Sequence, residues 1–338
     1  LELDPGGVLM LFGRRSILAA MAGMAFGLAI TSTSEAKPIV MRVAHAMPES
    51  HSYHLWVQKF REELEKRAPG RIDVQIFPNA QLGKETEYLE GLKLGTIDGA
   101  VLGRHGQIDP RLEVLNLPMI YRDAAHIDAV LRKDTPLQAE IDGIMYSRGY
   151  KVLGWGELGF RHITTKNKPI RTAADLKGIV IRVPNVEPWL VAFRAWGANP
   201  TPMDFAELYS ALQQGVVDAQ ENPPEIIYTS KFYEVQKFLS LTEHANIPSQ
   251  FILSREYWEK LPADLQEPVL EAAKVSRDYQ VALTREANAK LIKDLEKAGM
   301  TIVTDVDKDS FRAGAMEAYT KYEDQIGKEL IKAVQEAR

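Results

Sequence analysis

The sequence predicts an α/β fold with two domains, or with one domain that carries a large insertion. Three observations support this prediction. From Pro38 onward, strand-like and helix-like patterns alternate, which is typical of a largely parallel sheet covered by helices. The chain has 338 residues, 45% of them hydrophobic, which is enough for more than one core. The alternation breaks once, at residues 151–160, and then starts again.

The first half of the chain follows a strand–helix–strand rhythm. Residues 71–77 (RIDVQIF) alternate strictly, so Ile72, Val74 and Ile76 share one face of a half-buried strand. A helical pattern ends at Gly95, a residue that commonly terminates helices. We expect strands at 39–45, 71–77 and 97–102, and helices at 54–68 and 85–95.

The second half repeats this rhythm after a crossing segment. Residues 151–160 (KVLGWGELGF) mix apolar residues with three glycines, which suits a chain that leaves one domain and enters another. Residues 264–298 contain no glycine and a single proline, so we expect a long helix there that braces both domains. Between these segments we expect a strand at 179–184, helices at 187–196 and 205–215, and a short strand with a proline-stiffened loop at 216–224.

The N-terminal segment, residues 1–36, has the pattern of an export signal. Arg14 and Arg15 precede an uncharged stretch whose apolar part is rich in Ala and Gly, and small residues follow up to Ala36. The alternative is a membrane anchor, although a span normally needs about 20 strongly apolar residues. We therefore expect an exported protein, with Met10 as the start of its signal.

Composition and motifs exclude several kinds of chemistry. The chain has no cysteine, so disulfides and thiolate sites are excluded. Net charge is −5 with both signs interspersed, which argues against a nucleic-acid partner. The stretch GWGELG is followed by FRHIT and not by a helical run, so it is a poor dinucleotide-binding fingerprint. We expect no cofactor.

Three histidines lie close together between the first strand and the first helix. His45, His51 and His54 flank Glu49, but their spacing does not fit the usual zinc template of two histidines one helical turn apart with a distant third ligand. We interpret the stretch as a strand-to-helix loop in which Ser50 or Ser52 caps the helix. A metal site is the alternative.

Arg182 stands near the end of an otherwise apolar strand. In IVIRVP (179–184), strand alternation places Arg182 on the face opposite Ile181 and Val183, and Pro184 ends the ladder. Ligands in open α/β sheets collect outside the carboxyl ends of the strands, and a guanidinium can grip a carboxylate with two parallel hydrogen bonds. The alternative is a structural ion pair with Asp204 or Glu207.

Several long motifs carry a resemblance to one protein family. They are QLGKETEYLEGLKLGTIDGA (81–100), RTAADLKGIVIRVPN (171–185), GANPTPMDFAELYSALQQGVVDAQENP (197–223), KFYEVQKFLSLTEH (231–244) and SREYWEKLP (254–262). They resemble motifs of the DctP-type solute-binding proteins of tripartite ATP-independent periplasmic (TRAP) transporters, and the similarity runs from about residue 40 nearly to the C-terminus.

The resemblance implies a two-lobed periplasmic solute-binding protein fold with a long helix that spans both lobes. The two lobes would close over a small organic acid, and the chain would cross between them more than once. We expect lobe I to comprise residues 37–158 and 249–287, and lobe II to comprise residues 159–248 and 288–338.

The resemblance also implies a set of ligand-binding residues. Arg182 would hold the ligand carboxylate, with Arg161, Asn222 and Phe205 beside it in the second lobe. Glu85 and His45 would contribute from the first lobe. One departure from the family pattern is Ala219, which stands where glycine is usual.

The implied function is the periplasmic substrate-binding subunit of a TRAP transporter, which passes a small carboxylate to a permease of one small and one large membrane subunit. A mixed polar and aromatic lining favours a uronate or another sugar acid. Trp155, Trp189 and Tyr228 are aromatic candidates for that lining. The alternatives are a receptor for a C4-dicarboxylate or another hydroxy or keto acid, a receptor serving a sensor protein, and an exported enzyme with His45, Glu85 or Glu157 as general base.

Overall fold

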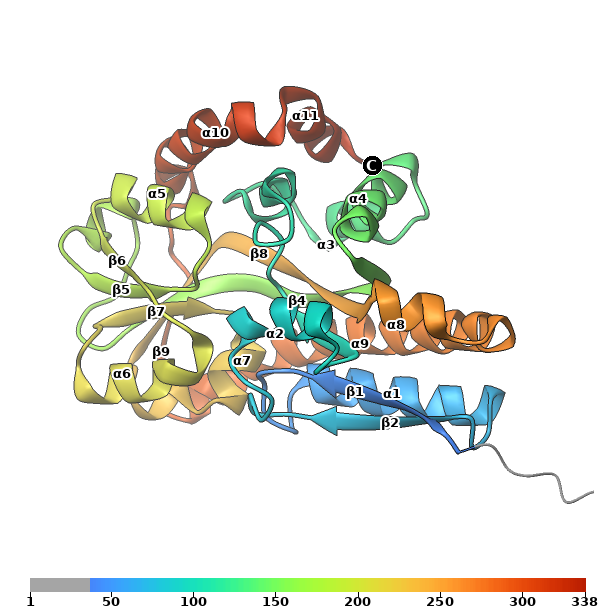
Figure 1. Cartoon of the computed structure of the whole chain (residues 1–338). Helices are drawn as coiled ribbons and strands as arrows, with labels where there is room; N and C mark the ends of the chain where they lie inside the picture. Colours follow the sequence, from blue (N-terminus) through green and yellow to red (C-terminus); the bar gives the residue numbers. More distant parts are fainter. Residues whose placement is uncertain (1–36) are drawn as a thin grey trace, which may run out of the picture. The chain divides into compact units, whose positions relative to one another are not determined.

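The computed structural model describes residues 37–338, which form one compact unit (Figure 1). The predicted export signal, residues 1–36, lies outside the described residues. The strands are β1 (Ile39–Ala44), β2 (Ile72–Phe77), β3 (Gly99–Leu102), β4 (Tyr150–Thr165), β5 (Val180–Val183), β6 (Asn199–Pro202), β7 (Ala219–Asn222), β8 (Phe238–Ser254) and β9 (Thr301–Val303).

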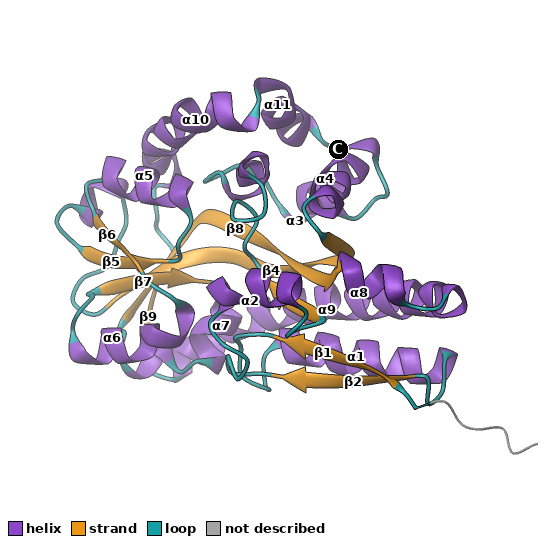
Figure 2. Cartoon of the chain, viewed as in Figure 1, coloured by secondary structure: helices purple, strands orange, loops and turns teal. Residues whose placement is uncertain are grey.

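Helices cover both faces of the sheet (Figure 2). Across residues 37–338, no helix has both the length and the apolar character needed to cross a membrane. The α-helices are α1 (Ser52–Arg67), α2 (Glu85–Leu94), α3 (Ala124–Leu131), α4 (Pro136–Ser147), α5 (Glu187–Ala195), α6 (Leu208–Gln214), α7 (Pro224–Thr229), α8 (Arg255–Lys260), α9 (Ala263–Lys297), α10 (Arg312–Ile326) and α11 (Lys328–Glu336). The 3₁₀ helices are η1 (Pro110–Asn116), η2 (Ala173–Leu176), η3 (Phe205–Glu207), η4 (Phe232–Glu234) and η5 (Lys308–Phe311).

The strands form one sheet in the order β2-β1-β3-β8-β4-β7-β5-β6, and β9 pairs with β8. The pairs within β1–β3, those within β5–β7 and the β8–β9 pair are parallel, whereas β3–β8, β4–β8 and β4–β7 are antiparallel. The prediction of a largely parallel sheet is therefore wrong at the centre. The reason is that β4 carries the chain out of one lobe and β8 carries it back beside β4, in the opposite direction.

The predicted α/β fold with two lobes is confirmed. The first lobe contains β1, β2 and β3, the second contains β5, β6, β7 and β9, and the long strands β4 and β8 belong to both (Figure 2). β4 contains the predicted crossing segment, 151–160. Its register against β8 shifts between Glu157 and Phe160, where Gly159 has a φ of +98°. The sheet is thus continuous but irregular where the chain crosses between lobes.

Local sequence signals explain most element ends. Gly95 ends α2 in the left-handed conformation, and Gly215 does the same for α6, as their sequence positions predict. The predicted N-cap of α1 is wrong, because the cap residue is His51. Neither Ser50 nor Ser52 takes that position. The His51 side chain accepts a hydrogen bond from the Tyr53 amide, and the Ser52 hydroxyl instead donates to Glu225.

Two buried apolar clusters hold the lobes together. One runs from α1 and β1 along the sheet into the second lobe. At its first-lobe end, the rings of Trp56 and Phe60 on α1 pack edge-on against Phe251 on β8. The other lies on the opposite side of the first-lobe strands, beneath η1, α3, α4, α10 and α11. Full burial of one large apolar side chain contributes about 2 kcal/mol, so these clusters dominate the stability of the unit.

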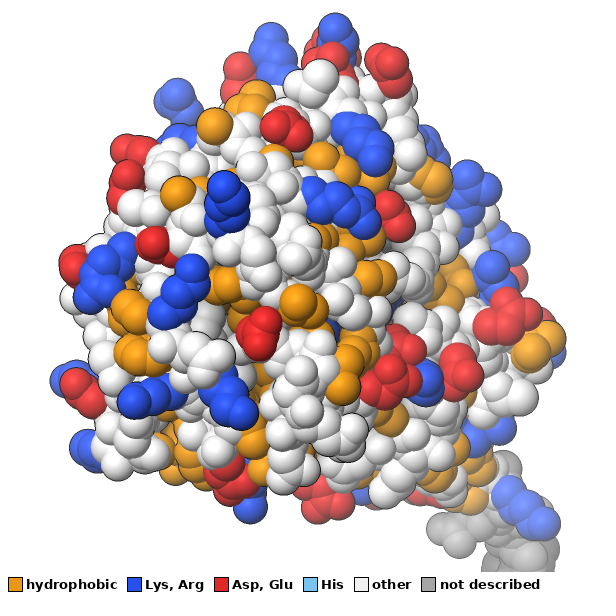
Figure 3. Space-filling view, turned by 90° about the vertical axis from the view of Figure 1, so that its left-hand side faces the viewer, with side chains coloured by type: hydrophobic (Ala, Val, Ile, Leu, Met, Phe, Trp, Pro, Cys, Tyr) orange, Lys and Arg blue, Asp and Glu red, His pale blue; other side chains and the backbone are white. Residues whose placement is uncertain are grey.

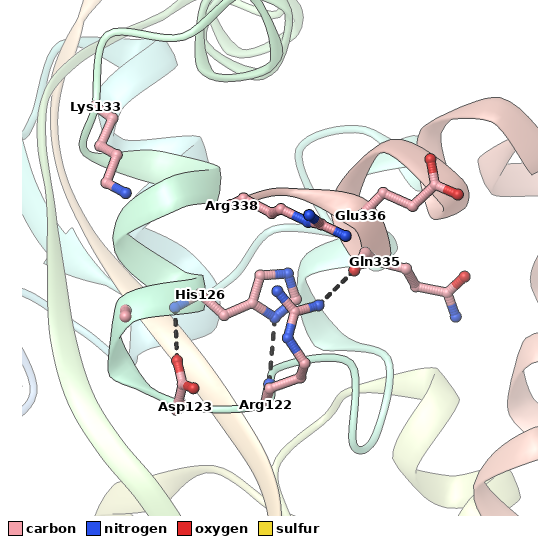
Figure 4. A pocket seen from close by; sticks show the side chains of 8 residues that line it. Arg122, Asp123, His126, Lys133, Gln335, Glu336 and Arg338 are labelled. Atoms are coloured by element: carbon pink, nitrogen blue, oxygen red, sulfur yellow. Dashed lines mark hydrogen bonds between the residues drawn. The ribbon is translucent and has the colours of Figure 1, made fainter.

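Two helical segments connect the lobes on opposite sides of the sheet. The predicted long helix is confirmed as α9, which packs on α1 and β4 and also on α7 and β9. At the C-terminus, α10 packs against α5 and η1, and α11 packs against η1. Arg122 donates a hydrogen bond to the carbonyl oxygen of Gln335 (Figure 4). A ring nitrogen of His126 forms a hydrogen bond with the carbonyl oxygen of Val334. The end of the chain is therefore fastened to the first lobe.

Candidate ligand-binding site

A cavity of about 40 Å³ lies between the two lobes, with room for about three water molecules. The structure brings five of the six predicted residues together around it: Arg182, Arg161, Asn222 and Phe205 from the second lobe and Glu85 from the first. His45 is not among the lining residues. The lining residues that sequence reasoning missed are Met47, Tyr53, Gly103, Arg104, Leu158, Pro184, Ile226 and Ile247.

Arg182 is placed by the end of β5, and 2% of its surface is exposed. Its Nε and Nη2 atoms donate to the carbonyl of Met203 at 3.0 and 2.8 Å. Within residues 37–338 it forms no ion pair with a carboxylate, so the alternative of a structural pair with Asp204 or Glu207 is wrong. Burial lowers the pKa of Arg182 to about 9, so the group is still charged at neutral pH.

Arg161, on β4, has a different environment because it is paired inside the protein. Its Nε and Nη2 atoms bind both carboxylate oxygens of Glu221, on β7, at 2.5 and 2.9 Å. The guanidinium also lies over the ring of Trp189, 5.0 Å from its centre. Burial raises the pKa of Glu221, but the charge and hydrogen bonds of Arg161 and the hydrogen bond to His244 together outweigh burial and hold this pKa below its ordinary value.

His244 completes this internal group. Its Nε2 atom lies 3.3 Å from an oxygen of Glu221, and its Nδ1 atom lies 2.8 Å from the Thr242 hydroxyl. Burial lowers the pKa of His244, so the ring is neutral at pH 7. Arg161 and Glu221 therefore form a compensated ion pair beside a neutral imidazole.

Asn222 follows Glu221 and lies at the end of β7. Its side-chain oxygen accepts a hydrogen bond from Arg161 Nη2 at 2.8 Å, and its amide nitrogen donates to Gln220 at 2.5 Å. The amide is thus held from both sides and is almost fully buried. Phe205 begins η3 and packs against Phe232 with its ring centre 6.0 Å away, so it supplies an apolar wall.

In the first lobe, Glu85 is the first residue of α2. Its carboxylate accepts hydrogen bonds from the backbone of Gly103 at 3.2 Å and from Arg104 Nε at 3.1 Å. Arg104 also reaches the second lobe, where its Nη2 lies 3.6 Å from an oxygen of Asp204. These three charged side chains link the two lobes at one side of the cavity.

His45 lies directly after β1, but its ring turns toward α1. Its Nε2 atom lies 3.2 Å from Nδ1 of His54, and the side chain is fully buried. Burial lowers the pKa of His45 to about 3, so it is neutral at ordinary pH. In the part of the chain that the structure describes, no three His, Cys, Asp or Glu side chains gather as a metal site would require.

The three aromatic residues expected beside the ligand lie elsewhere. Trp155 is buried and donates to Asp142, and Trp189 donates to the carbonyl of Asn116. Tyr228 lies on α7 with 37% of its surface exposed. The aromatic rings that line the cavity are those of Tyr53 and Phe205.

Comparison with known proteins agrees with this architecture. Residues 43–325 match the family model described as bacterial extracellular solute-binding protein, family 7. The 2,3-diketo-L-gulonate-binding periplasmic protein of Escherichia coli strain K12 is 34% identical over 320 residues, which cover 92% of this chain and 96% of that protein. The C4-dicarboxylate-binding periplasmic protein of Rhodobacter capsulatus is 32% identical over 335 residues, which cover 96% of this chain and 98% of that protein.

A solved structure gives the same result in three dimensions. The TRAP periplasmic solute-binding protein of a Polaromonas species, bound to D-erythronate, is 34% identical and has a TM-score of 0.85. The match covers 89% of this chain and 99% of that one. This chain therefore belongs to family 7 of the bacterial extracellular solute-binding proteins, the solute-binding components of TRAP transporters.

Proposed function

We propose that this protein captures a small organic acid with one carboxylate, best a uronate or another sugar acid, and delivers it to a TRAP permease. The observation that carries the proposal is Arg182, a buried guanidinium that lines the interlobe cavity and, among residues 37–338, bonds a backbone carbonyl but no carboxylate. A buried charge without a counter-ion is unfavourable, so an anionic ligand would be drawn to it.

The rest of the lining suits a polyhydroxy acid. Glu85 and the Asn222 amide offer acceptors and a donor for hydroxyl groups, and Phe205 offers an apolar surface for the carbon backbone. A C4-dicarboxylate is the second candidate, and the Rhodobacter capsulatus relative is named for binding one. We favour the sugar acid because a second carboxylate would meet Glu85 in the first lobe.

Capture would depend on closure of the lobes over the ligand. The cavity has room for about three water molecules, which is less than a six-carbon sugar acid needs, so we propose that the lobes separate to admit one. We propose that residues 37–158 with 249–287 move against residues 159–248 with 288–338, except that α11 stays with the first lobe, to which Arg122 and His126 bond it. β4 and β8 would be the flexible connection. Ligand binding can shift this equilibrium only by its higher affinity for the closed form.

An enzyme is less well supported than a receptor. His45 lies away from the cavity, and Glu157 is held by Arg132 and Arg285 at 3.1 and 2.9 Å. A hydrolytic or group-transfer site needs a nucleophile, a base and a group that orients the base. The lining residues do not form that arrangement, and we propose that the ligand leaves unchanged.

The setting would be the periplasm, after removal of residues 1–36. The relatives above are named periplasmic proteins, and the partner we propose is a membrane permease with one small and one large subunit. On the face shown in Figure 3, acidic and basic side chains are interspersed, without the continuous basic surface on which nucleic acids bind. A receptor that serves a sensor protein would use the same cavity with another partner.

The test begins with mass spectrometry of any ligand released from the purified protein. Titration calorimetry with D-erythronate, D-galactonate, D-galacturonate and succinate should then give the tightest binding with a sugar acid, and each acid should be recovered unchanged. Chemical conversion of an acid would indicate an enzyme. Failure of all four to bind would contradict the proposed ligand class, and tightest binding of succinate would favour the dicarboxylate candidate.

A further inference from the structure

Arg104 lines the cavity from the first lobe and contacts residues of both lobes. It follows β3 by two residues, and 3% of its surface is exposed. Its Nε donates to Glu85 at 3.1 Å, and its Nη2 lies 3.6 Å from Asp204 of the second lobe. Its Nη1 lies 3.5 Å from the carbonyl oxygen of Asn185, also in the second lobe. The guanidinium is therefore held between two carboxylates, one from each lobe.

The pairing of the three cavity arginines determines how many negative charges a ligand can bring. Arg161 is compensated by Glu221, and Arg104 is compensated by Glu85 and Asp204. Arg182 has a backbone carbonyl as its partner. One guanidinium is thus available to a ligand carboxylate. A second ligand carboxylate would have to displace Glu85 from Arg104 while remaining close to the Glu85 charge.

We propose that Arg104 is a specificity-determining residue: paired with Glu85, it restricts the cavity to acids with a single carboxylate. This inference rests on the proposed function, in which Arg182 binds the ligand carboxylate. Like charges brought together where water is excluded cost several kcal/mol, so the pair acts by repelling the second anionic group. When Glu85 is replaced by Gln, Arg104 keeps a more distant contact with Asp204, which Lys84 also approaches at 3.9 Å. Arg104 then becomes available to a second carboxylate.

Two matched pairs of acids test this inference. D-Galactonate and galactarate differ at one carbon, which is a primary alcohol in the first and a carboxylate in the second, and D-gluconate and D-glucarate differ in the same way. Calorimetry with the wild-type protein should show a preference for the monocarboxylate of about 100-fold in at least one pair. In Glu85→Gln this preference should fall by about tenfold or more, because the dicarboxylate gains Arg104 as a partner.

Two further variants show whether Arg104 causes the change. Glu207→Gln removes a carboxylate from the same side of the interlobe contact, where Glu207 binds Lys84 and not Arg104, so the preference should stay at the wild-type value. In the double variant Glu85→Gln with Arg104→Gln, the dicarboxylate should lose the affinity that it gained in Glu85→Gln alone. If Glu85→Gln fails to fold, Arg104→Gln alone provides the test. It should weaken the binding of both acids, because Glu85 is left as an unpaired negative charge, and it should weaken the binding of the dicarboxylate more.

The outcomes separate this inference from the proposed function. An unchanged preference in Glu85→Gln, with the monocarboxylate still bound, would refute the role of Arg104 and leave the receptor function intact. Equal binding of both members of each pair by the wild-type protein would do the same. Binding of succinate with no binding of the four sugar-derived acids would refute the proposed ligand class, and the inference with it.

Discussion

Arg182 and Arg161 are two buried guanidinium groups on one cavity, and their partners give them different roles. Arg161 is held by both oxygens of Glu221, so its removal leaves a buried carboxylate without a counter-ion. Arg182 bonds the carbonyl of Met203, so its removal leaves a backbone group that water or a neighbour can satisfy. We therefore expect substitution of Arg161 to damage the fold as well as the proposed site, and substitution of Arg182 to weaken mainly ligand binding.

We expect Arg182→Ala to weaken carboxylate binding by about 100-fold or more, because a buried charge partner contributes roughly 2–5 kcal/mol. Arg182→Lys should restore little of this affinity, since an ammonium cannot present the planar fork that matches a carboxylate. Calorimetry with the identified acid measures both effects. Arg194→Ala, on the exposed face of α5, is the matched control and should bind normally. Affinity within threefold of wild type for Arg182→Ala would contradict the assigned role.

The sequence predicts some of these residues and not others for a physical reason. Arg182 is conspicuous because it interrupts an apolar strand just before a proline, and that signal is local. Glu221 becomes the partner of Arg161 only through the register of β4 on β7, between residues 60 positions apart. Arg104 also follows a strand, but its two carboxylate partners come from α2 and from the loop before η3. His45 follows the first strand, as the sequence predicts, but its ring packs toward α1 and does not line the cavity.

Among the elements, β4 carries the main irregularity of the sheet at the crossing between lobes. Gly159 sits at a register shift with a φ of +98°, and a Cβ atom there would lie 2.3 Å from Nδ2 of Asn288 on α9. Asn288 cannot easily move away, since it donates to the carbonyl of Leu158 and accepts from the amide of Glu225. The side chain of Asn288 therefore ties the crossing strand to α9 and to the start of α7.

We expect Gly159→Ala to lower the free energy of unfolding by about 3 kcal/mol, from the strained backbone and the loss of Asn288 hydrogen bonds. Gly178→Ala is the matched control. Gly178 has a φ of +78° with nothing within 4 Å of the added methyl, so that variant should lose about 1 kcal/mol. Urea unfolding of the ligand-free proteins measures the difference. Equal losses in the two variants would show that Asn288 does not constrain the crossing.

The elements themselves follow from local sequence more directly than their pairing does. The length of α9 is predictable because no glycine interrupts residues 264–298, and the end of α2 is predictable from Gly95. The antiparallel centre of the sheet is not, because it depends on β8 returning beside β4 after more than 70 residues. Periodicity identifies a strand, but it carries no information on which distant strand will lie beside it.

For the molecule as a whole, buried titratable groups make stability depend on pH in two opposing ways. Burial lowers the pKa of His45 and His162 to about 3 and that of His105 to about 4. Burial raises the pKa of Glu113 to about 7. The histidines favour the folded state above their ordinary pKa of about 6.5, whereas neutral Glu113 favours it below its ordinary pKa of about 4.5.

We therefore expect stability to fall as the pH is lowered from 6.5 toward 4. The unfolded chain takes up protons on the three histidines in this range, and each can cost up to about 1.4 kcal/mol per pH unit. Glu113 opposes this loss between pH 7 and 4.5, because the folded state then binds its proton more tightly than the unfolded chain does.

Glu113→Gln removes the opposing contribution, so the stability of this variant should fall more steeply than that of wild type over the same range. His162→Asn should make the fall shallower. Urea unfolding at intervals between pH 4.5 and 7.5 measures the slopes. Parallel curves for wild type and Glu113→Gln would show that Glu113 keeps its ordinary pKa in the folded protein.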